Sequence, residues 1–296
     1  MRVAVRSVVV FLALLAGAVA AVAAAPEPNS AAALRARFAG LGEQLSHNQF
    51  QRALYLESSE PPNGSKGDIY ALVEYPFATV GAALNSPAQW CAVLILHLNT
   101  KYCGASTDNA RSTLVLKVGR KYNQPLKDAF GFEFAFRVAS GSPDYLQVRL
   151  NADNGPLGTS NYRIMLEAIP VGGGQTFLHL TYSYGYGIAG RVAMQAYLST
   201  AGRDKVGFTV DGRQPDGQPD YVRGVRGMVE RNSMRYFLAI DAYLSALAAP
   251  LQEQFEKRLQ YWINAVERYP RQLHEMERAA YLEMKRSEQS QRQAAM

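Results

Sequence analysis

Hydrophobic and polar residues alternate with a period of two between Arg111 and Tyr186, through several successive segments. Side chains of a β-strand point alternately to its two faces, so the alternation predicts strands with one apolar and one polar face. The apolar positions are Leu114, Leu116, Val118, Phe130, Phe132, Phe134, Phe136, Val138, Leu146, Val148, Leu150, Tyr162, Ile164, Leu166, Ala168, Leu178, Leu180, Tyr182 and Tyr184. Turn-forming stretches at 141–144, 153–156 and 172–174 separate the later segments, which predicts an antiparallel meander.

The opposite face of this meander carries polar residues such as Glu133, Gln147, Arg149 and Glu167. An antiparallel sheet commonly has one packed face and one solvated face. We therefore expect this polar face to meet water and the apolar face to meet a core or a cavity.

Helical patterns lie on both sides of the meander. A helix is expected over 31–45, a strand over 68–75, and two short helices after it, the second beginning at Ser86 and Pro87 and ending near Leu98. A short helix at 189–198 and a long helix from about 221 to 248 follow the meander. Pro250 ends the long helix, and further helical segments run to Met296. The segment 205–210 is a candidate for one more strand.

This order of elements resembles the helix-grip fold of the START-like superfamily, which includes polyketide cyclases and lipid-transfer proteins. The resemblance covers about 68–248 and includes one short opening pattern, Pro76-Phe77-Ala78-Thr79-Val80 followed by Asn85-Ser86-Pro87-Ala88-Gln89-Trp90. It implies an α+β fold in which an antiparallel meander wraps a long C-terminal helix. Two features depart from the family: six strands are predicted where seven are usual, and the helices after Pro250 have no counterpart.

The chain divides into four parts on these patterns. Residues 1–25 carry two early arginines, an apolar run and an Ala-x-Ala site, which is typical of a secretory signal peptide cleaved after Ala25. A retained membrane anchor is the alternative, because the apolar run from 8 to 25 is near the lower limit for a bilayer span. Residues 26–67 are a leader and linker, 68–248 the helix-grip domain, and 249–296 a helical extension. The location expected is the periplasm or the outside of the cell.

Two cysteines, Cys91 and Cys103, are present in the 296 residues. Export and an even number of cysteines favour a disulfide bond between them, and two buried free thiols are the alternative. Neither these cysteines nor the four histidines show the spacing of a metal site, so we expect no metal and no cofactor.

Composition and charge narrow the classes of function. With 48% hydrophobic and 19% charged residues, the chain can bury a core. Its net charge of +6 is spread along the sequence, which does not indicate nucleic-acid binding.

The apolar face of the meander is the candidate ligand site, because it combines aliphatic and aromatic side chains with a few phenolic hydroxyls. A filled core without a cavity would show the same alternation. The candidate ligand-binding residues are Phe132, Phe134, Tyr162, Leu166, Leu180, Tyr182, Tyr184 and Tyr236.

Two polar features near this face are open to two interpretations each. His97 could serve a ligand or act as a base, or it could be a structural histidine at a helix end. The cluster 230–235 could bring polar groups to one end of the long helix, or it could be an ordinary solvated helix face. No catalytic residue is identified.

The function predicted is an exported binding protein for a hydrophobic small molecule or lipid, without turnover. One alternative is a cyclase- or hydrolase-type enzyme that uses the same cavity. Another is an interaction protein that docks a partner or a membrane surface through 251–292, where Leu251, Phe255, Trp262 and Val266 form an apolar stripe.

Overall fold

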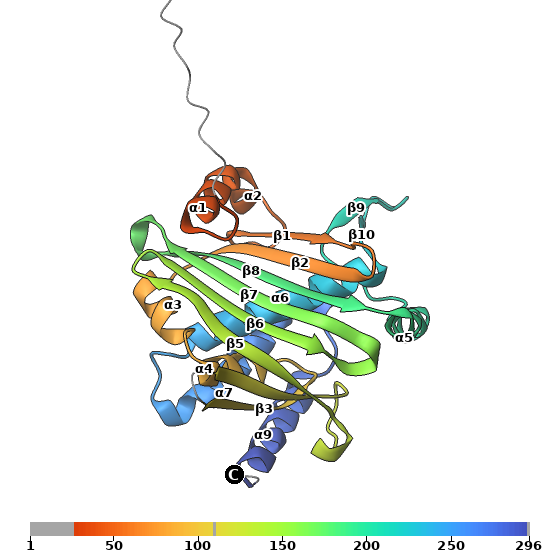
Figure 1. Cartoon of the computed structure of the whole chain (residues 1–296). Coiled ribbons are helices and arrows are strands. Elements are labelled where there is room, and N and C mark those ends of the chain that lie inside the picture. The colour runs from red at the N-terminus through yellow and green to blue at the C-terminus, as the bar shows by residue number, and fades with distance from the viewer. Residues whose placement is uncertain (1–26, 109–110, 295–296) are drawn as a thin grey trace, which may run out of the picture.

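One antiparallel sheet of eight strands curves around a long helix, α6 (Gly224–Ser245), in a computed structural model that describes residues 27–108 and 111–294 (Figure 1). The strands lie in the order β1-β2-β8-β7-β6-β5-β4-β3. They are β1 (Leu54–Ser59), β2 (Gly64–Val73), β3 (Thr100–Asp108), β4 (Arg111–Val118), β5 (Phe130–Ser142), β6 (Tyr145–Asn154), β7 (Thr159–Pro170) and β8 (Thr176–Tyr186). The predicted helix-grip arrangement is confirmed. The expected signal peptide, 1–25, lies outside the described residues.

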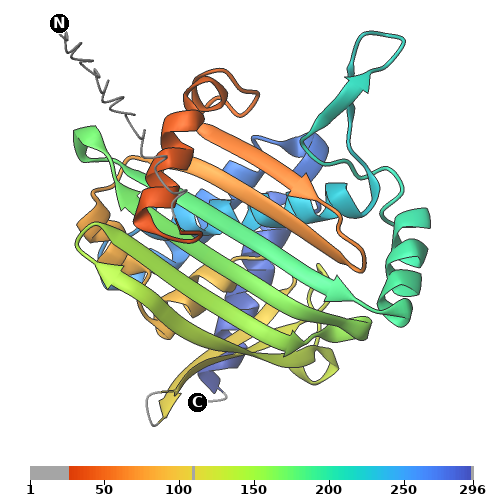
Figure 2. The same cartoon turned by 45° about the horizontal axis from the view of Figure 1, so that its top comes forward.

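The helices divide between the two faces of the sheet. Figure 2 shows α1 (Ala31–Gly40) across one face, while α6, α7 (Leu251–Val266) and α9 (Arg278–Ala294) lie behind the other. The remaining helices are α2 (Gly42–Ser46), α3 (Phe77–Ala83), α4 (Pro87–Leu94), α5 (Ile188–Ser199) and α8 (Pro270–Leu273). None of the helices within the described ranges is long and apolar enough to cross a membrane.

Two strands of the sheet are absent from the prediction. β1 lies inside the segment 26–67, which we expected to precede the domain, and it pairs with β2 along its whole length. β3 pairs with β4, but its second half is exposed and polar, so it lacks the alternation that identifies a strand. The candidate strand 205–210 is wrong: only Val210 is extended, in a small hairpin of β9 (Val210–Arg213) and β10 (Pro219–Tyr221) outside the main sheet.

The long helix approaches the sheet most closely at β2. A Cβ atom added to Gly67 would collide with the hydroxyl of Ser233, so only glycine fits at this crossing. The α6 helix contacts β1, β2 and β8. It therefore lies nearer to one edge of the sheet than to the other.

The disulfide between Cys91 and Cys103 is present and joins α4 to β3, with the two Cα atoms 5.3 Å apart. It encloses the loop that carries His97 and Asn99. The predicted pairing is confirmed.

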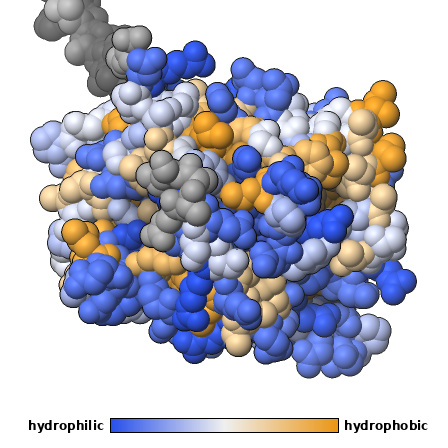
Figure 3. Space-filling view, turned by 90° about the horizontal axis from the view of Figure 1, so that it is seen from below, coloured by the Kyte–Doolittle hydropathy of each residue, from blue (hydrophilic) through white to orange (hydrophobic). Residues whose placement is uncertain are grey.

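The C-terminal helices belong to the same core as the sheet. Leu251 is 84% exposed, but Trp262 and Val266 are buried against α6 and α9. The docking alternative would be favoured by an exposed stripe, but α6 and α9 cover Trp262 and Val266, and only the Leu251 end is exposed. On the face shown in Figure 3, hydrophobic side chains occur in separate groups among hydrophilic ones.

Buried polar contacts attach α9 to the loop before β3. Lys285 donates hydrogen bonds to the carbonyl oxygens of His97 and Thr100, both at 2.8 Å, and the Tyr281 hydroxyl donates to the carbonyl oxygen of Leu96 at 2.9 Å. Glu288 accepts from Lys285 and Lys101, at 2.8 and 2.9 Å. These contacts give hydrogen-bond donors to carbonyl oxygens of the loop, including that of His97, which also accepts from the backbone N–H of Thr100 at 3.0 Å.

The polar face of the sheet is not wholly solvated, which corrects the expectation from the alternation. The α1 helix packs on it through Leu34 and Phe38, and beneath this helix Gln147 and Glu167 are each 3% exposed. His179 lies between two carboxylates: its Nδ1 is 2.9 Å from Glu167 and its Nε2 is 2.9 Å from Asp68. Because both partners accept hydrogen bonds, both ring nitrogens must donate, and the imidazole is a cation.

We predict that His179 titrates above pH 6.5. Burial lowers its pKa, but hydrogen bonds to Asp68 and Glu167 raise it further, and the net direction is upward from 6.5. A raised folded-state pKa gives stability that is complete below pH 6.5 and is lost as the pH rises through the folded value. The imidazole signals in an NMR titration measure this pKa. Glu167→Gln should move it back toward 6.5, and a wild-type value at or below 6.5 would refute the assignment.

Candidate functional site

Two adjoining cavities lie between the apolar face of the sheet, α5 and α6. The first, which we call the α5 chamber, has a volume of about 320 Å³ and reaches Met194 and Tyr197 of α5. The second, the His97 chamber, has a volume of about 580 Å³ and extends to Phe132 and His97. Both are lined by Asn99, Pro156, Leu157, Tyr162, Tyr182 and Asn232. The sheet face predicted from the alternation therefore borders cavities as well as a core.

Five of the eight predicted ligand-binding residues line these chambers. Tyr162, Tyr182 and Tyr184 line the α5 chamber, and Phe132, Tyr162, Tyr182 and Tyr236 line the His97 chamber. Their rings form one cluster, in which Tyr182 and Tyr236 have centroids 5.1 Å apart and Tyr162 and Tyr184 are stacked at 5.5 Å.

The other three predicted residues do not line either chamber. Leu166 and Leu180 are fully buried and face each other across β7 and β8, while Phe134 is 2% exposed behind Phe132 and Tyr162. Along β7 and β8, the residues that border the chambers are Tyr162, Tyr182 and Tyr184, toward one end of the two strands. Residues nearer the other end of these strands pack into the core.

The phenolic hydroxyls that line the chambers differ in their hydrogen bonding. The Tyr162 hydroxyl donates to Thr159 Oγ1 at 2.9 Å, whereas those of Tyr182 and Tyr236 have no hydrogen bond to another described residue. Burial raises the pKa of Tyr182 and Tyr236 above the usual value, so both remain protonated. Each can therefore donate a hydrogen bond to a ligand.

His97 faces the second chamber and stacks on Tyr236, with centroids 5.0 Å apart. Its Nδ1 accepts a hydrogen bond from the backbone N–H of Asn99 at 3.2 Å, so the neutral ring carries its proton on Nε2. Nε2 is buried, and no partner for it lies among the described residues. Burial, followed by the charges of Arg235, Lys285 and Lys121, holds the pKa of His97 well below 6.5. The imidazole is therefore a neutral donor and a weak base.

The cluster 230–235 is buried, so its interpretation as a solvated helix face is wrong. Arg231 and Arg235 are each 2% exposed and line the α5 chamber together with Asn232. Glu230 points elsewhere and accepts the backbone N–H groups of Phe208 and Thr209 at 2.6 and 2.9 Å. The sequence shows these charges at one end of the long helix but carries no signal that they are buried.

Glu275, which follows α8, forms ion pairs that fix the positions of Arg235 and Lys121, two cations that line the α5 chamber. Glu275 pairs with Lys121, Arg235 and Lys205 at 2.6, 2.8 and 2.9 Å. The pKa of Glu275 falls to about 2, because the attraction of Arg235 and Lys121 outweighs burial. Burial and the charge of Arg235 lower the pKa of Lys121 to about 8. Among the residues in the described ranges, no group of three or more metal-binding side chains was found.

Comparisons with known proteins found similarity only among solved structures. No protein-family model matches the chain, and a search of curated proteins found no match. Norcoclaurine synthase from Thalictrum flavum is 11% identical, with a TM-score of 0.32 over 50% of this chain and 78% of the synthase. Human StAR-related lipid transfer protein 5 is 11% identical, with a TM-score of 0.32 over 57% of this chain and 89% of that protein.

A conserved protein of unknown function from Enterococcus faecalis is 10% identical, with a TM-score of 0.34 over 72% of this chain and 91% of that one. All three scores are below 0.5. The helix-grip assignment therefore depends on the strand order and the position of α6 in this chain.

Proposed function

We propose that this chain is an exported protein that binds a hydrophobic small molecule or lipid in the two chambers and releases it unchanged. In this proposal residues 1–25 act as a cleaved signal peptide, and the Cys91–Cys103 disulfide is compatible with an oxidising compartment. The observation that carries the proposal is the aromatic wall of Phe132, Tyr162, Tyr182 and Tyr236, which borders open volume.

The chemistry of the walls supports binding of an apolar molecule. Ligand pockets combine mainly apolar surface with a few polar groups that orient the ligand. Here Met194 and Met228 add flexible, polarisable surface to the tyrosine rings, and the free hydroxyls of Tyr182 and Tyr236 supply the orienting donors. Leu157 and Ile188, at 63% and 86% exposure, place apolar surface beside the α5 chamber.

The enzymatic alternative has less support in this geometry. A general base needs a free acceptor and a suitable pKa. The Nδ1 atom of His97 is already occupied by a backbone N–H, and the pKa of the ring is depressed. Asp128, which borders the His97 chamber, is exposed to solvent.

We predict that a neutral, environment-sensitive dye binds the folded protein with one-to-one stoichiometry and is displaced by extracted lipid. Ala193→Trp should abolish this binding with little loss of stability, because Ala193 borders the α5 chamber and the new ring fills open volume. Fluorescence titration and thermal unfolding measure the two effects.

The matched control is Ala196→Trp, an exposed position on the same helix. It should bind the dye as the wild type does. Absence of dye and lipid binding by the wild type, or equal loss in both variants, would refute the proposed cavity.

A further inference from the structure

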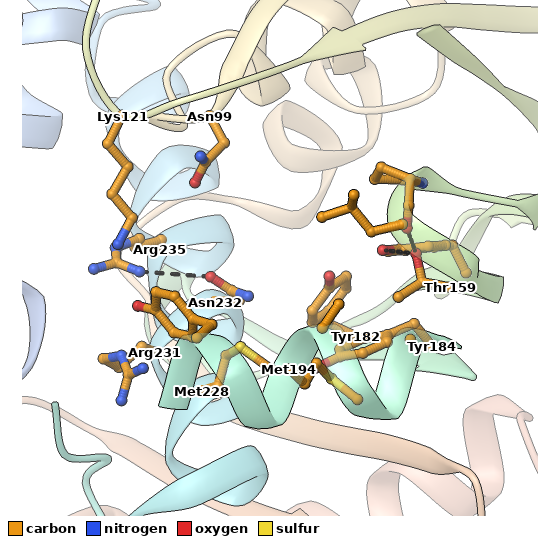
Figure 4. Close-up of a pocket in the computed structure, with 16 residues that line it drawn as sticks. Asn99, Lys121, Thr159, Tyr182, Tyr184, Met194, Met228, Arg231, Asn232 and Arg235 are labelled. Atoms are coloured by element: carbon orange, nitrogen blue, oxygen red, sulfur yellow. Dashed lines mark hydrogen bonds between the residues drawn. The ribbon is translucent and has the colours of Figure 1, made fainter. Parts of the chain in front are cut away.

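The wall of the α5 chamber formed by α6 is cationic. Arg231 and Arg235 lie four residues apart and so occupy the same face of the helix. Lys121 comes from the loop after β4 and borders the same chamber. Figure 4 shows these three side chains together on one side of the chamber, with Tyr182 and Tyr184 on the other and Met194 and Met228 between.

This wall is not neutralised by the protein. Glu275 is shared by Arg235, Lys121 and Lys205, so a single carboxylate serves three cations. Arg231 donates from Nη1 to the carbonyl oxygen of Val206 at 3.1 Å, and within the described part of the chain it forms no ion pair with a carboxylate. The three cations of the wall thus have one carboxylate among them, which Lys205 also shares, so the wall carries an excess of positive charge.

Buried charge without a counter-charge is costly, and a bound anion would offset that cost. Burial, and then the charge of Arg235, lower the pKa of Arg231, and the opposing effects of Tyr197 and Glu275 are smaller. Arginine is well suited to bind such an anion, because its planar group of N–H donors matches the oxygens of a carboxylate or phosphate.

We propose that the α5 chamber binds an amphiphile by its anionic head group, a carboxylate or a phosphate, held among Arg231, Arg235 and Lys121. The apolar part of the ligand then lies against Met194, Tyr182 and Tyr184. This inference rests on the proposed function and specifies the class of ligand.

Four probes test the head group: dodecanoate, dodecyl phosphate, 1-dodecanol and inorganic phosphate. Because a charge-assisted hydrogen bond strengthens binding, we expect at least one of the two anionic amphiphiles to bind about 10- to 100-fold more tightly than the alcohol. Dye displacement measures these affinities. Inorganic phosphate should compete weakly, because it lacks the apolar part. Binding of dodecanol alone supports the cavity, so equal affinity for dodecanol and both anions would overturn this inference but leave the proposed function standing. Phosphate binding as tight as that of dodecyl phosphate would overturn the amphiphile as ligand.

Arg231→Met separates a binding role from a structural one. It should reduce the affinity for the preferred anion to about that of dodecanol, leave dodecanol binding unchanged, and not lower the melting temperature of the ligand-free protein, since it removes an unneutralised charge. Arg191→Met is the matched control: it removes the same charge from exposed α5, beside the chamber but outside its wall, and should keep the preference.

A second variant covers the case in which Arg231→Met does not fold. Lys121→Met removes a less buried cation, 29% exposed, and should also weaken the preference for the anion about tenfold. An unchanged preference in whichever variant folds would refute the inference.

Discussion

Glu288→Gln should lower the free energy of unfolding by about 3–5 kcal/mol. Glu288 is 3% exposed and is the carboxylate partner of both Lys101 and Lys285, which are each 1% exposed. The amide keeps the shape of the side chain but leaves two buried ammonium groups without a counter-charge. Chemical denaturation measures the loss. Glu283→Gln, at an exposed position of the same helix, should change stability by no more than about 0.5 kcal/mol.

The defect in Glu288→Gln should shrink at alkaline pH. Burial lowers the pKa of Lys285 from 10.5 to about 8, so between these values the unfolded chain binds more protons than the folded one. Above about pH 8 the folded wild type loses this ammonium charge, so its ion pair with Glu288 no longer contributes and the difference in stability between wild type and variant falls. A variant that loses as much stability near pH 10 as near pH 7 would contradict the role given to Lys285.

Trp262→Ala should cost about 3–5 kcal/mol, the usual range for a large aromatic residue removed from a core. Trp262 is fully buried, stacks on Tyr281 with centroids 4.9 Å apart, and donates from Nε1 to the carbonyl oxygen of Arg235 at 3.1 Å. Thermal or chemical unfolding of the variant measures the cost.

The neighbouring Tyr261, 47% exposed, provides the control, since Tyr261→Ala should cost far less. If the C-terminal helices were a separate docking extension, the two substitutions would differ little in stability. The comparison thus also tests whether 249–296 completes the domain.

The sheet was predictable because its alternation is strong where one face is buried and the other polar. β5 to β8 show this pattern, whereas β3 loses it after Cys103 and β1 is short, so both were missed. The burial of Glu167 and His179 could not be predicted, because nothing in the period of two indicates that α1 lies over the polar face.

Only part of the candidate site could be predicted from the sequence, because only part of it lies on the strands with the period of two. The tyrosines belong to the periodic face and could be identified. Arg231 and Arg235 could not be distinguished from solvated charges, because their burial depends on covering segments from elsewhere in the chain, such as α5 and the region around Glu275. Leu166 and Leu180 share the parity of the tyrosines but are fully buried in the core and border neither chamber.

The contacts between α9 and the loop before β3 join two segments that are synthesised at different times. The wall that carries His97 and Asn99 is held by Tyr281 and Lys285, which follow it by more than 180 residues. Synthesis proceeds from the N-terminus, so all residues of the sheet and both cysteines are made before these side chains exist. Long-range contacts of this kind also form slowly. A chain that ends before α9 therefore lacks the contacts that hold His97 and Asn99 in the wall of the His97 chamber.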